Sequence, residues 1–76
     1  NLIREKELTQ IIEREIAALP KKMREVFLLS RNTELSHREI GKLLGISETT
    51  VKKQVSNAVR ILRLKVNLSV LLFYFF

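Results

Sequence analysis

The chain has 76 residues, a formal net charge of +6 and no cysteine. A chain this short forms one domain with a thin core, because it buries only about 60% of the surface of its unfolded form. The lack of cysteine excludes a disulfide framework and a thiolate zinc site, and it fits a reducing cytoplasm.

The positive charge is concentrated in the middle of the chain. Residues 21–65 hold eleven Lys and Arg against four Glu, whereas residues 66–76 hold no charged residue. This distribution favours a polyanionic partner, with nucleic acid ahead of anionic lipid. The alternative is a basic surface that serves only to keep the protein soluble.

The spacing of apolar residues predicts an all-α fold. Only Pro20, Gly41 and Gly45 can break a helix, and no alternating, strand-like run occurs before the C-terminal tail. We expect helices at about 2–19, 20–31, 36–44 and 48–66. Residues 1–66 then form the domain, and residues 67–76 form an apolar tail.

The first two expected helices each have an apolar side. In the first, apolar residues recur every three or four positions. They are Leu8, Ile11, Ile12, Ile16 and Leu19. Pro20 ends this helix and can open the next, because its missing N–H costs nothing in a first helical turn. The second helix is expected to turn Met23, Val26, Phe27 and either Leu29 or Ser30 inward.

The third helix has the clearest start signal. Ser36 followed by Glu39 forms a capping box, in which each side chain satisfies a free amide of the other residue. Ile40, Leu43 and Leu44 are expected to form its apolar face. Its end is expected at Gly45, because glycine takes the left-handed conformation that often terminates a helix.

The fourth helix follows the third after a short turn. Ile46 is expected to point into the core, and Ser47 to cap the helix that begins at Glu48. A short capped helix, a glycine turn and a long second helix are typical of a helix-turn-helix. The predicted architecture is a four-helix domain with a C-terminal helix-turn-helix, of winged-helix-like or homeodomain-like topology without a sheet.

The polar side of the fourth helix is the candidate binding surface. With about 100° per residue, Val51, Val55, Ala58 and Leu62 share one side of the helix. The opposite side carries hydroxyl, amide and cationic groups, and no acidic residue occurs after Glu48. Hydroxyls and amides can bind base edges, and cations can bind phosphates. In a helix-turn-helix the second helix enters the major groove and the first crosses the DNA backbone.

This geometry assigns the candidate residues. The candidate base contacts are Thr49, Thr50, Lys52, Lys53 and Ser56. The candidate backbone contacts are His37, Arg38, Lys42, Ser47, Asn57, Arg60 and Arg63. No metal site is expected, since His37 is the sole histidine and there is no cysteine. Without Asp, Cys or a phosphate-binding glycine loop, no catalytic residue, cofactor or small-molecule substrate is expected either.

Two stretches resemble region 4 of bacterial sigma factors. "ALPKKMREVFLL" and "LSHREIGKLLGISETTVKKQVSNAVRILR" agree in order and spacing with the extracytoplasmic-function group, from Ala18 to Arg63. Gly41 departs from the alanine usual in that group. Glycine weakens a helix by about 1 kcal/mol, but it leaves room for the next helix.

The resemblance implies a function and partners. Such a domain binds the −35 element of promoter duplex DNA and packs against the β flap of RNA polymerase in the cytoplasm. An anti-sigma protein often restrains related factors. A domain that opens the −10 element would precede Asn1, so this chain alone is expected to bind duplex DNA without initiating transcription.

Two alternative assignments also fit the sequence. Response-regulator DNA-binding domains share part of the second stretch, although they open differently. A helical protein-interaction or membrane-surface module is the other, because "VNLSVLLFYFF" holds four of the five aromatic residues. As a helix, eleven residues span only about 16 Å, too short to cross a bilayer. The tail is expected to pack on the domain, to mediate self-association, or to bind an anti-sigma protein or a membrane surface.

Overall fold

The computed structural model describes residues 5–66 and contains four helices there. They are α1 (Glu5–Ala17), α2 (Lys21–Asn32), α3 (His37–Leu44) and α4 (Glu48–Lys65). No strand occurs in this part of the chain, so the all-α prediction is confirmed. The predictions for residues 1–4, for the side chain of Leu8 and for the tail 67–76 lie outside the described residues.

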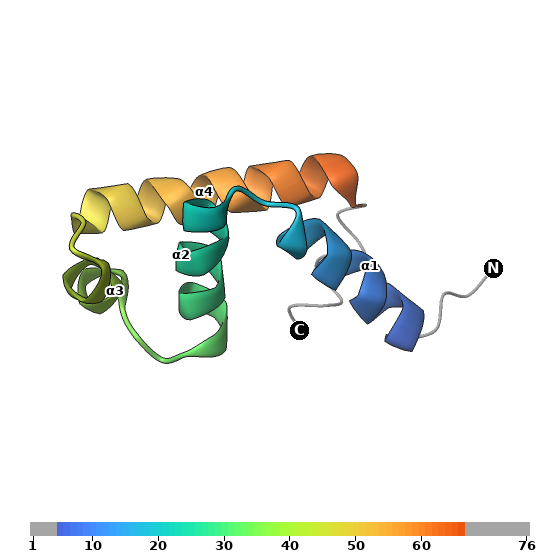
Figure 1. Ribbon diagram of the computed structural model, residues 1–76, viewed down its shortest axis with the longest axis horizontal. Coiled ribbons are helices and arrows are strands. Elements are labelled where there is room, and N and C mark those ends of the chain that lie inside the picture. Colours follow the sequence, from blue (N-terminus) through green and yellow to red (C-terminus); the bar gives the residue numbers. More distant parts are fainter. Residues whose placement is uncertain (1–4, 67–76) are drawn as a thin grey trace.

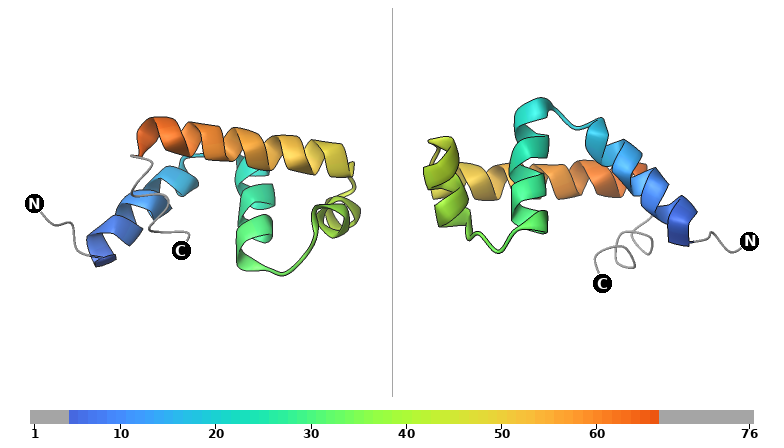
Figure 2. Two further views of the ribbon diagram at one scale, coloured as in Figure 1. Left: turned by 180° about the vertical axis from the view of Figure 1, so that it is seen from behind. Right: turned by 60° about the horizontal axis from the view of Figure 1, so that its bottom comes forward.

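The long helix α4 organises the fold. It contacts each of the other three helices, and all three lie on the same side of it (Figure 1). In Figure 1, α3 lies under the beginning of α4, α2 under its middle and α1 under its end, and both views of Figure 2 show the same order along α4. The opposite side of α4 is therefore left uncovered by any helix of the described segment.

The buried residues form two apolar clusters along α4. The larger cluster joins α1, α2 and α4 and consists of Ile12, Ile16, Leu19, Phe27, Ala58, Leu62 and Val66. The smaller cluster joins α2, α3 and α4 through Val26, Ile40 and Val51, and Ile46 from the turn packs against it. Val26 and Phe27 are neighbours in α2 but belong to different clusters. Helix α2 therefore connects the helix-turn-helix to the rest of the domain.

The structure corrects some sequence predictions. Helix α1 ends at Ala17, two residues before the expected end, and α2 begins at Lys21, with Pro20 as the residue before its first turn. Leu43 is not part of the apolar face of α3, because 63% of its surface is exposed. The side of α3 that faces the core carries Ile40 and Gly41, both of which are buried.

Both ends of α3 are fixed by the residues predicted for them. The Ser36 amide donates to Glu39 Oε1 at 2.8 Å, and the Glu39 amide donates to Ser36 Oγ at 3.1 Å, which completes the capping box. At the other end Gly45 has φ 72° and ψ 32°. This left-handed conformation strains any residue with a Cβ, so glycine allows the chain to turn here.

Because of the capping box, the domain is expected to lose stability at acidic pH. The hydrogen bond from the Ser36 amide is the main cause that holds the pKa of the Glu39 carboxyl below its ordinary value of 4.5, and the Ser36 hydroxyl and the charge of Lys42 add to it. A carboxyl with a lowered folded pKa stabilises the fold fully above its unfolded pKa and loses that contribution as pH falls through the folded pKa. We expect urea unfolding to show this acid loss. The Glu39→Gln variant, which does not titrate, should show a smaller loss; equal losses in both proteins would contradict the assignment.

Candidate nucleic-acid interface

The uncovered side of α4 carries most of the predicted DNA contacts. Its exposed polar and cationic residues are Thr49, Lys52, Lys53, Ser56, Arg60 and Arg63. The buried side of the same helix carries Val51, Ala58 and Leu62, each 0% exposed. The core therefore fixes the rotation of α4 about its own axis, and that rotation directs the cations outward.

The beginning of α4 is fixed by its cap. The Ser47 hydroxyl accepts from the Thr50 amide at 3.0 Å and donates to Thr50 Oγ1 at 2.9 Å. The capping role expected of Ser47 is thus present, and its hydroxyl both accepts from and donates to Thr50. The turn places this cap beside the end of α3, so α3 ends and α4 begins at one fixed corner.

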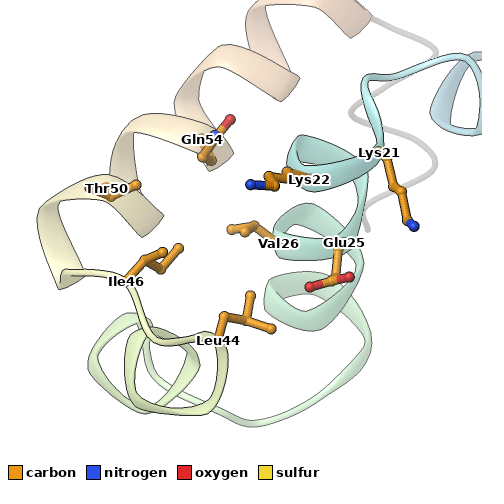
Figure 3. A pocket seen from close by; sticks show the side chains of 8 residues that line it. All are labelled: Lys21, Lys22, Glu25, Val26, Leu44, Ile46, Thr50 and Gln54. Carbon is orange, nitrogen blue, oxygen red and sulfur yellow. The ribbon is translucent and has the colours of Figure 1, made fainter.

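Thr50 occupies a different side of α4 from the other candidate base contacts. Counting about 100° per residue from Val51, Thr50 and Lys52 lie on opposite flanks of the helix. Thr50 lines a groove that α4 forms with α2 (Figure 3). The structure brings Thr49, Lys53 and Ser56 together and leaves Thr50 at the edge.

Asn57 and Arg60 form a polar pair further along α4. Arg60 Nη2 donates to Asn57 Oδ1, and Asn57 is half-buried. Arg60 also lines a shallow hollow with Ser56, Val59 and Arg63. The pairing holds the Arg60 guanidinium in place against the helix, where it can meet a phosphate without a large loss of side-chain freedom.

Helix α3 adds cations near the start of α4. Arg38 and Lys42 are exposed and are four residues apart, so they share one side of α3. His37 is the first residue of α3 and is half-buried. These are the α3 residues predicted to contact the DNA backbone, which the first helix of a helix-turn-helix crosses.

An ion pair occupies the first turn of α4. Lys52 Nζ lies 3.2 Å from Glu48 Oε2. The sequence signal for this pair was the spacing of four residues, which brings the two side chains together on one side of a helix. The charge of Lys52 is therefore partly balanced by Glu48.

A groove between α2 and α4 was not among the features predicted from the sequence. It has a volume of about 500 Å³ and is lined by Lys21, Lys22, Glu25, Val26, Leu44, Ile46, Thr50 and Gln54. Figure 3 shows Lys22 pointing across it toward Gln54, while Lys21 points away. Its floor is apolar and its rim is polar, a combination common in sites that bind another protein segment.

Nowhere between residues 5 and 66 do three or more His, Cys, Asp or Glu side chains gather where they could hold a metal ion. Among the helices of this segment, none has the length and apolarity to cross a membrane.

Comparison with known proteins identifies the family. Residues 9–62 match the family model described as sigma-70, region 4. The chain is also 42% identical over 53 residues to the ferric citrate uptake sigma factor FecI of Escherichia coli (strain K12). That alignment covers 70% of this chain and 31% of the relative, so the chain spans about a third of the relative's length. No solved structure matches the chain significantly. The matched family confirms the sigma-factor resemblance over the response-regulator alternative, and the chain belongs to the sigma-70 region 4 family.

Proposed function

We propose that this domain binds the −35 element of promoter duplex DNA and so directs RNA polymerase at the initiation of transcription. The observation that carries the proposal is the uncovered side of α4, where Thr49, Lys53, Ser56 and Arg60 are exposed together and no acidic residue follows Glu48. Membership of the sigma-70 region 4 family supports the same role.

The arrangement of α3 and α4 suggests how the duplex is bound. The first turns of α4 enter the major groove, where Thr49 and Ser56 offer hydroxyls to base edges and Lys53 offers an ammonium to guanine O6 or N7. Arg38 and Lys42 on α3 bind the phosphates at the edge of that groove. Phosphate contacts provide most of the affinity and the register, while the base contacts provide the sequence preference.

The second half of α4 extends the contact along the backbone. Arg60 and Arg63 lie one and two turns beyond Ser56 on the exposed side. Guanidinium groups bind phosphates with two parallel hydrogen bonds, so these residues favour one orientation of the helix on the duplex. The core under α4 keeps these contacts in line with the base-contacting turns.

The Lys53→Ala variant tests this surface. We expect it to bind a selected duplex about tenfold more weakly than the wild type, as a lost base or phosphate contact predicts. The matched control is Lys65→Ala, which removes the same charge from the exposed last turn of the same helix. Fluorescence anisotropy measures both affinities. Equal affinities of the two variants and the wild type would contradict the proposed surface.

We further propose that the groove between α2 and α4 binds the β flap of RNA polymerase in the cytoplasm. Its apolar floor, formed in part by Val26 and Ile46, supports this choice. Because the chain has no cysteine, a Gln54→Cys variant carries a single crosslinking group at the groove. We expect it to crosslink to the isolated β flap, whereas Glu7→Cys on α1 should not. An anti-sigma protein is a further proposed partner, carried by the family resemblance alone.

A further inference from the structure

The first turn of α4 carries a carboxylate at the edge of the cationic surface, on the flank opposite Thr50. Glu48 is the sole acidic residue of α4, and it contacts Lys52. Both side chains remain open to solvent, since 61% of the Lys52 side chain and 45% of the Glu48 side chain is exposed. A negative charge at this position repels phosphates, so it opposes the general attraction for DNA that the rest of the helix provides.

Stability explains little of this placement. An exposed ion pair four residues apart on a helix contributes little, and so does an acid near a helix start. The Ser47 cap already satisfies the Thr50 amide. The remaining distinctive property of Glu48 is its position, at the first residue of the helix that enters the major groove.

We propose that Glu48 is a specificity-determining residue that accepts a hydrogen bond from the N4 amine of cytosine, an inference that rests on the proposed DNA binding. A carboxylate can only accept, and in the major groove cytosine presents a donor where thymine and guanine present acceptors. Adenine also has an amine, but its N7 acceptor lies beside it and repels a carboxylate. Glu48 therefore favours cytosine.

The contact with Lys52 completes the arrangement. Four residues correspond to about 6 Å along the helix axis, which places the Lys52 ammonium near the following base pairs. The ammonium donates to guanine O6 or N7 there, and Glu48 limits how far it can swing toward a phosphate. Because the pair has no net charge, it adds discrimination between sequences rather than general affinity.

The test is selection from a pool of random duplexes followed by affinity measurements on single base-pair changes. The wild type should select a cytosine at one position and should bind about tenfold more weakly when that base pair is changed. Glu48→Ala should lose this discrimination and bind unrelated duplexes more tightly. Glu48→Gln should shift the preference toward adenine, because a glutamine amide pairs with adenine N6 and N7. Both substitutions are at an exposed side chain, and circular dichroism checks that the fold is kept.

The control and the outcomes separate this inference from the proposed function. Glu7→Gln removes the same charge from an exposed position on α1, and it should leave the selected sequence unchanged. If the wild type selects a sequence and both Glu48 variants select the same one, the role of Glu48 is overturned while the proposed function stands. If the wild type selects no sequence, both are overturned.

Discussion

The Leu62→Ala variant is expected to lose about 2–5 kcal/mol of unfolding free energy, the range for deleting a fully buried leucine side chain. Leu62 is 0% exposed and lies in the cluster that joins α1, α2 and α4. Native domains are stabilised by only about 0.05–0.15 kcal/mol per residue, so the loss would remove a large part of the stability of this chain. Chemical denaturation followed by circular dichroism measures it.

Leu64→Ala is the matched control for that experiment. The two leucines are two residues apart on α4, but 81% of Leu64 is exposed. The same truncation there should change the unfolding free energy by about 0.5 kcal/mol or less. Equal losses in the two variants would show that the end of α4 does not pack on α1 and α2 as described.

Gly41→Val is expected to destabilise the domain by about 1–3 kcal/mol, the usual effect of forcing extra atoms into a packed position. A Cβ on Gly41 would lie 2.6 Å from the Ile46 carbonyl oxygen and 3.4 Å from the Glu48 nitrogen. Both are backbone atoms, so relief requires the turn and the start of α4 to move away from α3. DNA affinity should therefore fall even under conditions where the variant is folded.

Thermal unfolding and duplex binding measured on the same protein test both parts of this prediction. Leu43→Val serves as the control, because it places valine in the same helix at a residue that is 63% exposed. It should cost well under 1 kcal/mol. A Gly41→Val protein as stable as the wild type would contradict the close packing of α3 against the turn.

The parts of the fold that depend on local chemistry could be predicted from the sequence. The capping box of Ser36 and Glu39, the left-handed Gly45 and the Ser47 cap each involve residues within a few positions of one another. Their hydrogen-bond donors and acceptors lie close together independently of the tertiary fold. A motif of three or four residues is therefore sufficient to identify them.

The exposure of Leu43 could not be predicted in this way. A helix of two turns offers few apolar residues from which to find its buried side, and here one buried position is Gly41, which has no side chain to mark it. Ile40 and Leu43 alone suggest a buried side shifted away from Gly41. The close approach of the turn, which is a contact between segments, sets the true direction.

The helix that covers each flank of α4 could not be predicted from the sequence either. Periodicity identified the buried side, because Val51 and Leu62 recur with the helical period. It does not say which neighbouring helix covers which flank. The groove with α2 therefore appeared only in the structure, and with it the separation of Thr50 from Thr49 and Lys53.

If cations on α3 and α4 hold a DNA duplex, the affinity for that duplex falls steeply with salt, and this measurement tests the proposed interface most directly. Each phosphate neutralised contributes about 0.9 to the slope of log affinity against log salt. Phosphate contacts from Arg38, Lys42, Arg60 and Arg63 therefore predict a linear fall with a slope of roughly −4. Affinity that does not change with salt, or no binding to any duplex at low salt, would contradict the account.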